Sequence, residues 1–170
     1  TNYQSCHHLP GWYELCKEHT PQTVFLQKES DFVQSLAGFN WPGYFVKDYV
    51  KSLTTSRGSI ARTPEEVAEV VSLIDSYRGQ IEGGVCIRRF ESLLPDTEER
   101  YFVFQGRAYG RTATIPDLVN EIAEKIASPF FSVDVVFSTD GTLRLIELGD
   151  GQVSDRKLWP AEKFAQMLRV

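Results

Sequence analysis

FFSVDVVFSTDGTLRLIELGDG, residues 130–151, contains two strand-like apolar runs separated by a turn signal, and each run contains a misplaced acid. Asp140-Gly141 favours a two-residue hairpin, because a type I′ turn needs positive φ at both of its central positions. Counting outward from that turn, Asp134 falls directly opposite Glu147 on one face of the hairpin. The sequence therefore predicts that the two carboxylates face each other across neighbouring strands, with Cβ atoms about 5 Å apart.

Like charges in that position destabilise a sheet unless a shared proton or a bound cation lies between them. Asp150 follows between two glycines, which free the backbone to turn a third carboxylate inward, although strict alternation places it on the opposite face. Oxygen ligands of this kind suit Mg²⁺ or Mn²⁺ better than zinc. The residues leave two interpretations open: a metal site at Asp134, Glu147 and Asp150, or a polar strand face on which the acids never meet.

The composition is that of an ordinary globular protein, with 42% hydrophobic and 24% charged residues in 170. This length suffices for one domain with a core or for two small lobes. The net charge of −5 argues against a nucleic-acid partner. No apolar run reaches the roughly 18 residues of a membrane span, and no signal peptide is visible, so we expect a cytoplasmic protein without a membrane partner. The oligomeric state stays open.

The order of the predicted elements indicates the fold class. We expect helices over residues 12–18, 29–37 and 117–126, a helix capped by Thr63 and a last helix beginning at Pro160; the expected strands are 23–26, 43–50, 85–91, a hairpin over 100–109 and the acidic hairpin. Because the strands come mainly as hairpins with helices between them, the pattern favours an α+β fold with antiparallel sheets over a doubly wound parallel sheet.

A second group of residues is suited to binding an anion. Lys47 lies on the strand over 43–50, and Lys51 shares its face if that strand stays regular. The following segment, Ser56-Arg57-Gly58-Ser59, has small hydroxylic residues around a glycine and can lay backbone N–H groups along phosphate oxygens. An ordinary surface turn with solvated lysines is the alternative interpretation.

Arg100 and Glu91 also have two interpretations each. Arg100 opens a strand after a charged turn, where it is either solvated or a bidentate phosphate clamp. Glu91 can accept hydrogen bonds from a ribose or an adenine amino group, or pair with Arg88 or Arg89.

Taken together, the order of these motifs resembles the ATP-grasp family, the carboxylate–amine ligases and their relatives that clamp ATP between two α+β lobes. The order is a strand lysine, a small-residue glycine loop, a helix, a hinge strand, a Glu-x-Arg strand, and an Asp and Glu-x-x-Asp on a terminal hairpin. The resemblance runs from about residue 43 to 156. It is closest to small ATP-grasp proteins with a Val-Lys-Asp-Tyr-Val-Lys-Ser type of strand, residues 46–52 here, and a Glu-Leu-Gly-Asp-Gly-Gln type of ending, residues 147–152.

The resemblance implies an α+β, ATP-grasp-like fold of two small lobes with antiparallel sheets, packed helices and a nucleotide cleft between the lobes. It implies that residues 43–170 form the nucleotide-binding catalytic domain. Residues 1–42 are then a remnant of a preceding domain, and because the chain begins at Thr1 without a methionine, we expect that an N-terminal portion is missing.

The same resemblance implies roles for individual residues. Lys47 and Arg100 are expected to act in catalysis at the ATP phosphates, residues 56–59 to form the loop that closes over them, and residues 85–91 to form the hinge that holds adenine and ribose. The residues expected to contact the nucleotide are Lys47, Lys51, Ser56, Arg57, Gly58, Ser59, Arg89, Glu91 and Arg100. The expected ligands of Mg²⁺, or of Mn²⁺, are Asp134, Glu147 and Asp150, and Asp150 stands where most of the family has asparagine.

The expected function is that of an ATP- and Mg²⁺-dependent ligase. It would phosphorylate a carboxylate substrate, either a small molecule or a peptide, and couple the acyl phosphate to an amine or similar nucleophile. Two alternatives remain open from the sequence: another ATP-using phosphotransferase on the same scaffold, and a non-catalytic nucleotide-binding or interaction module.

Overall fold

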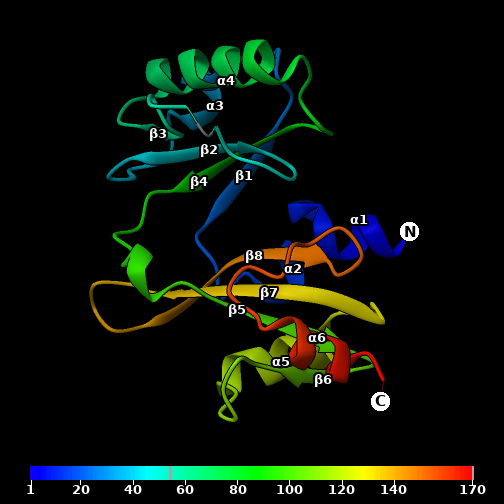
Figure 1. Ribbon diagram of the computed structural model, residues 1–170. Coiled ribbons are helices and arrows are strands. Elements are labelled where there is room, and N and C mark those ends of the chain that lie inside the picture. Colours follow the sequence, from blue (N-terminus) through cyan, green and yellow to red (C-terminus); the bar gives the residue numbers. More distant parts are fainter. Residues whose placement is uncertain (54, 170) are drawn as a thin grey trace. The chain divides into compact units, whose positions relative to one another are not determined.

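The computed structural model describes residues 1–53 and 55–169, which divide into two compact units (Figure 1). Unit 1 consists of Thr1–Thr20 together with the chain from Ser92 onward, and unit 2 consists of Pro21–Glu91. Each unit contains one four-stranded antiparallel sheet with helices, so the predicted α+β fold with antiparallel sheets is confirmed. The expected boundary at 42/43 lies inside unit 2, and the division of labour expected for residues 1–42 and 43–170 stays a prediction.

Unit 2 is a sheet in the order β1-β4-β2-β3 with two helices. Its strands are β1 (Thr23–Leu26), β2 (Tyr44–Asp48), β3 (Ile60–Ala61) and β4 (Val85–Arg89), and its helices are α3 (Phe32–Leu36) and α4 (Pro64–Arg78). The core contains Tyr44, Val46, Val85 and Ile87 from one face of the sheet, together with buried side chains of both helices.

The start of α4 follows the sequence prediction closely. The hydroxyl of Thr63 accepts a hydrogen bond from the amide of Glu66, which identifies Thr63 as the N-cap. The Glu66 carboxylate accepts from the amide of Arg62 at 2.9 Å, one residue before the position expected for a capping box. The apolar residues spaced along one helix face are all buried: Val67, Val70, Val71 and Ile74.

Unit 1 is a sheet in the order β6-β5-β7-β8, and the N-terminal helices of the chain belong to the same unit. Its strands are β5 (Glu99–Phe104), β6 (Arg107–Tyr109), β7 (Phe130–Phe137) and β8 (Leu143–Asp150). Its helices are α1 (Asn2–His7), α2 (Leu9–Cys16), α5 (Asp117–Lys125), α6 (Ala161–Met167) and the short 3₁₀ helix η1 (Pro95–Thr97). Figure 1 shows α1 lying beside β8.

The two hairpins of unit 1 use different turns. Gln105 and Gly106 have φ of 50° and 78°, the signs that a type I′ turn requires between β5 and β6. In the acidic hairpin only Gly141 has positive φ, 85°, and the amide of Ser138 donates to the carbonyl of Thr142. The predicted type I′ turn at Asp140-Gly141 is therefore wrong: the loop has three residues and ends on a glycine in the left-handed region.

This longer loop shifts the register of β7 and β8 by one position, and a β-bulge shifts it back. Phe137 pairs with Leu143 and Val135 with Leu145, but Asp134 pairs with Glu147, which leaves Ile146 as the extra residue. The predicted facing pair Asp134–Glu147 is confirmed, although the bulge rather than the turn produces it.

Within residues 1–53 and 55–169, no helix is long and apolar enough to cross a membrane.

Candidate functional site

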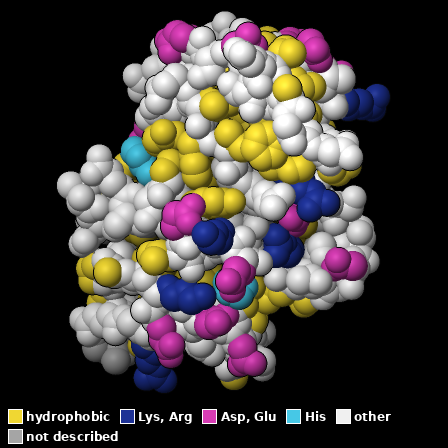
Figure 2. All heavy atoms as spheres, turned by 180° about the vertical axis from the view of Figure 1, so that it is seen from behind, with side chains coloured by type: hydrophobic (Ala, Val, Ile, Leu, Met, Phe, Trp, Pro, Cys, Tyr) yellow, Lys and Arg dark blue, Asp and Glu magenta, His cyan; other side chains and the backbone are white. Residues whose placement is uncertain are grey.

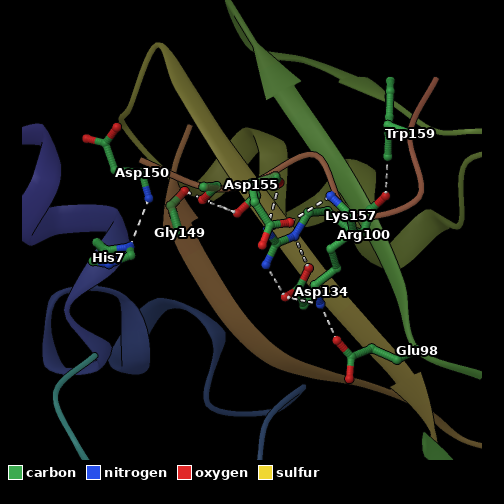
Figure 3. A network of polar contacts seen from close by, with 11 residues as sticks. His7, Glu98, Arg100, Asp134, Gly149, Asp150, Asp155, Lys157 and Trp159 are labelled. Atoms are coloured by element: carbon green, nitrogen blue, oxygen red, sulfur yellow. Dashed lines mark hydrogen bonds and ion pairs between the residues drawn. The ribbon is translucent and has the colours of Figure 1, made fainter. Parts of the chain in front are cut away.

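The centre of the acidic hairpin is a buried ion pair between Asp134 of β7 and Arg100 of β5. The two residues are cross-strand partners, so their side chains leave the sheet on the same face. The guanidinium binds the carboxylate in a bidentate fashion, with Nε 2.7 Å from Oδ1 and Nη2 2.6 Å from Oδ2 (Figure 3). Asp134 is 2% exposed, so this is a desolvated pair with the fork geometry that makes arginine–carboxylate bonds strong.

A second cation reaches the same carboxylate from the segment after β8. Lys157 Nζ lies 3.0 Å from Asp134 Oδ2 and also binds Glu98 Oε1 (Figure 3). Burial lowers the pKa of Lys157, but the hydrogen bond to Glu98 and the charge of Asp134 outweigh this effect and leave that pKa raised. Lys157 is therefore a charged ammonium in this cluster.

Glu147, the cross-strand partner of Asp134, adds a further carboxylate beside this ion pair. Burial lowers the pKa of Arg100, whereas the hydrogen bonds and charge of Asp134, with smaller contributions from Asp155 and Glu147, raise it overall. The charges of Arg100 and Lys157 thus remove the repulsion expected between the facing acids, a remedy that differs from both the shared proton and the bound cation expected from the sequence. On the face that Figure 2 shows, acidic and basic side chains are likewise interspersed.

The C-terminal segment fixes the position of Arg100 on its other side. The carbonyl of Arg100 accepts a hydrogen bond from the indole of Trp159 at 2.8 Å, and Arg100 Nη1 donates to the carbonyl of Asp155 at 2.9 Å. Trp159 is 2% exposed and packs edge-on against Phe102, two residues along β5. Arg100 is therefore positioned by the sheet, by its carboxylate partner and by residues 155–159.

The structure does not bring Asp150 to Asp134 and Glu147. Asp150 pairs with Phe131 across β7 and β8, so it lies on the opposite pleat, and Figure 3 shows its side chain directed away from Asp134. Its amide donates to Nδ1 of His7 in α1, and its carboxylate accepts from the amide of Gln152 at 2.8 Å. These contacts give Asp150 a local structural role at the end of β8.

The donor set of Asp134 and Glu147 suits one particular kind of magnesium site. Among the residues that the structure describes, no three His, Cys, Asp or Glu side chains gather into a metal-binding group. Mg²⁺ is commonly held by only one or two carboxylates, with substrate phosphates and water completing its shell. Two carboxylates opposite each other fit that arrangement and do not need Asp150.

Unit 2 presents a cationic face of its own. Lys47 on β2 pairs with Cys86 on β4, and Phe45 pairs with Arg88, so Lys47 and Arg88 share one face of the sheet and are diagonal neighbours. Both are 5% exposed. Burial raises the pKa of Cys86 to about 12, while the nearby charges of Lys47 and Arg88 act in the opposite direction. The core side chains of this sheet, among them Val46 and Ile87, alternate with these residues and lie on the other face.

Lys51 does not share this face. β2 ends at Asp48, whose carboxylate accepts hydrogen bonds from the amides of Val50 (2.7 Å) and Lys51 (2.6 Å) and also binds Arg78. This Asx-type turn takes the chain out of the strand, so the expected alignment of Lys47 with Lys51 is wrong. The side chain of Lys51 is exposed.

The small-residue loop is only partly available for a ligand. Gly58 has φ of 65°, and Ser56 beside it is exposed. Ser59 is 4% exposed, and its hydroxyl accepts a hydrogen bond from the amide of Leu53 at 2.7 Å, so this residue holds the base of the loop. Arg57 donates to the carbonyl of Ile60 and lies near two acids of α4. Residue 54 lies outside the described part of the chain.

Arg89 and Glu91 lie at the end of the hinge strand. Arg89 pairs with Tyr44, which places it on the core side of the sheet and opposite to Lys47, and its side chain is exposed at the end of β4. Glu91 follows the end of the strand and is half-buried. Of the two neighbouring arginines, Arg88 and not Arg89 lies with Lys47.

Two residues of these clusters were missed by the sequence interpretation. Arg88 had a usable signal, because alternation from Lys47 through the antiparallel partner strand selects it over Arg89 once the register is known. Lys157 had none: it lies seven residues beyond β8, and only the path of the C-terminal segment brings it back to Asp134.

Comparisons with known proteins agree with this fold. Cdc123 from Schizosaccharomyces pombe superposes with a TM-score of 0.67 at 14% identity, covering 97% of this chain and 91% of that one. D-alanine–D-alanine ligase from Bacillus anthracis, complexed with ATP, gives 0.58 at 15% identity, covering 97% and 61%. The ATP-grasp ligase PsnB, complexed with minimal precursor, Mg and ADP, gives 0.57 at 13% identity, covering 89% and 52%.

A search of curated proteins gave no significant match. A family profile described as an ATP-grasp domain, family 3 of its clade, matches residues 30–168, which is most of the chain. The resemblance drawn from the sequence motifs is thereby confirmed, and the chain belongs to this ATP-grasp domain family.

Proposed function

We propose that this protein is an ATP- and Mg²⁺-dependent ligase that activates a carboxylate substrate as an acyl phosphate and transfers the acyl group to an amine or similar nucleophile. The observation that carries the proposal is the facing pair Asp134–Glu147 with Arg100 bound to it, in a chain that belongs to the ATP-grasp family. Two structural relatives support the ligand choice, because their complexes hold ATP in one case and Mg with ADP in the other.

In unit 1 we assign Asp134 and Glu147 to the metal and Arg100 to the transferred phosphoryl group. When bound, Mg²⁺ would neutralise negative charge on the β- and γ-phosphates. Arg100 is held by Asp134 and by the carbonyl of Asp155, so its guanidinium is already oriented before a ligand arrives. Such preorganisation lowers the reorganisation cost of stabilising charge in the transition state.

In unit 2 we assign Lys47 and Arg88 to the ATP phosphates. Each is buried on the same sheet face, where a fixed cation interacts more strongly with phosphate than it would in water. Ser56 and Gly58 are the loop residues best placed to offer backbone N–H groups, since Ser59 and Arg57 have structural contacts. Glu91 remains the proposed polar contact of the hinge with the ribose or adenine.

The proposed reaction needs no protein nucleophile. The substrate carboxylate attacks the γ-phosphorus, the bond to the β–γ bridging oxygen breaks, and ADP leaves. The amine then attacks the acyl phosphate carbon and releases inorganic phosphate. Arg100 and Lys47 stabilise the negative charge that moves during the first step, so catalysis consists of positioning and electrostatics.

The test is the release of ADP and trapping of an acyl group by hydroxylamine. The protein is incubated with Mg-ATP, hydroxylamine and pools of carboxylic acids or peptides, and hydroxamate and ADP are measured. Glu147→Gln should abolish both products while its circular dichroism stays native. Glu124→Gln, an exposed carboxamide substitution on α5 in the same unit, should leave both unchanged.

Each alternative function predicts a different result. A phosphotransferase with a hydroxyl acceptor releases ADP but yields no hydroxamate. A nucleotide-binding module binds ATP and yields neither product over long incubation. ADP release by Glu147→Gln at the wild-type rate would contradict the assignment of Glu147.

A further inference from the structure

The ammonium of Lys157 occupies a position that a cation bound to Asp134 would also need. Asp134 Oδ2 already accepts from Arg100 Nη2 at 2.6 Å and from Lys157 Nζ at 3.0 Å. Its other oxygen accepts from Arg100 Nε. Both carboxylate oxygens therefore have cationic partners, and Lys157 is the one whose long, flexible side chain can withdraw.

The backbone around Lys157 is held in an uncommon conformation. Lys157 has φ of 45°, the left-handed region that L-residues avoid at a cost of about 1–2 kcal/mol. Such a conformation persists where surrounding contacts stabilise it. The contacts are those of the Lys157 amide with Asp155 Oδ1, at 2.6 Å, and of its ammonium with Glu98 and Asp134.

The anchors of Lys157 differ in strength. The side chain of Glu98 is 36% exposed, and that of Asp134 is 3% exposed. The side chain of Lys157 is 34% exposed, so its ammonium has a route to solvent while remaining bound to Glu98. The side chain of Arg100 is 10% exposed and is bound to both Asp134 and Asp155, so it has no comparable freedom.

We propose that Lys157 is a built-in counter-ion of the metal site: its ammonium stabilises Asp134 when the site holds no metal, competes with a divalent cation for that carboxylate, and moves away when the metal binds. This inference rests on the proposed function, because it takes Asp134 and Glu147 as the metal ligands. Lys157 then sets the metal affinity of the site, and its withdrawal links metal binding to the position of residues 151–157.

The size of the effect follows from charge repulsion. A cation beside a carboxylate lowers the affinity of that carboxylate for a proton by about ten- to a thousandfold, and a divalent ion is repelled more strongly than a proton. Removing the charge of Lys157 should therefore tighten metal binding by at least about tenfold.

The experiment measures Mn²⁺ binding to the metal-free protein without nucleotide, from the loss of the free Mn²⁺ signal in electron paramagnetic resonance. Lys157→Met keeps the aliphatic stem and removes the charge, and Lys157→Arg keeps the charge. Lys17→Met is the matched control, because Lys17 is an exposed lysine of the same unit that pairs with Glu14. If Lys157→Met is too unstable to purify, Lys157→Gln, whose amide still donates a hydrogen bond to Asp134, replaces it.

The expected result is Mn²⁺ binding at least about tenfold tighter in Lys157→Met, with Lys157→Arg and Lys17→Met near wild type. Added Mn²⁺ should also raise the melting temperature of Lys157→Met more than that of wild type. Unchanged or weaker Mn²⁺ binding in Lys157→Met would overturn the inference. If that protein still binds Mg-ATP, the proposed function stands; if neither protein binds Mn²⁺ or Mg-ATP, the proposed function fails as well.

Discussion

At the scale of single residues, the site depends on one buried carboxylate with two cations. Asp134 was predictable as a residue that needs a positive partner, because an acid inside an apolar strand is costly unless it is compensated. Its partners were not predictable, since Arg100 comes from a strand 34 positions earlier and Lys157 from a segment 23 positions later. The sequence interpretation therefore supplied a metal where the protein has its own cations.

Asp134→Asn should lower the free energy of unfolding by about 3–5 kcal/mol, because it leaves the buried guanidinium of Arg100 without its counter-charge. Urea denaturation measures the change. Asp96→Asn, at an exposed position of η1, should change it by less than about 0.5 kcal/mol. Equal stabilities of Asp134→Asn and wild type would mean that the ion pair is not formed in solution.

At the scale of elements, the acidic hairpin shows which parts of a strand pair can be read from sequence. The strands, their pairing and the position of the loop follow from alternation and from the Asp-Gly signal. The loop length and the bulge at Ile146 do not, because a two-residue and a three-residue loop share that signal. Two errors of one residue cancelled, so Asp134 still faces Glu147. Helix α1 was missed, although Thr1 and Gln4 form its capping box, because the segment is too short for a clear apolar period.

Gly141→Ala should destabilise the protein by about 1–2 kcal/mol, because alanine is strained at the φ of 85° that the hairpin loop requires. Open space surrounds the position, so the cost is conformational rather than steric. Gly38→Ala is the matched control: its surroundings are equally open and its φ is not positive, so it should be neutral or slightly stabilising. Thermal unfolding of both variants measures the difference, and equal melting temperatures would argue against the three-residue loop.

At the scale of the whole molecule, the chain order conceals the division into units. Residues 1–20 belong with the chain from Ser92 onward, while Pro21–Glu91 forms a separate unit. A boundary search along the sequence cannot find such an arrangement, because the segments of unit 1 are joined only by tertiary contacts. Thr20, for example, donates its hydroxyl hydrogen to the carbonyl of Leu145 at 2.7 Å. The family resemblance covered both units, since its motifs are spread over the chain.

The stability of the molecule should fall at alkaline pH through two buried thiols. Burial raises the pKa of Cys16 in unit 1 to about 11 and that of Cys86 in unit 2 to about 12. Above about pH 9 the unfolded chain loses these protons while the folded chain keeps them, so the free energy of unfolding decreases as pH rises. Urea denaturation at pH 8 and pH 10 should show a smaller decrease in Cys16→Ala/Cys86→Ala than in wild type. An equal decrease in both proteins would show that other groups cause it.

The central claim, that the facing acids of the hairpin form the metal side of an ATP site, is tested most directly by calorimetry of ATP binding with and without Mg²⁺. Wild type and Glu124→Gln should bind ATP more tightly in the presence of Mg²⁺, and Glu147→Gln should lose that Mg²⁺-dependent gain. Mg²⁺-dependent binding that survives in Glu147→Gln, or no ATP binding by wild type under either condition, would contradict the account.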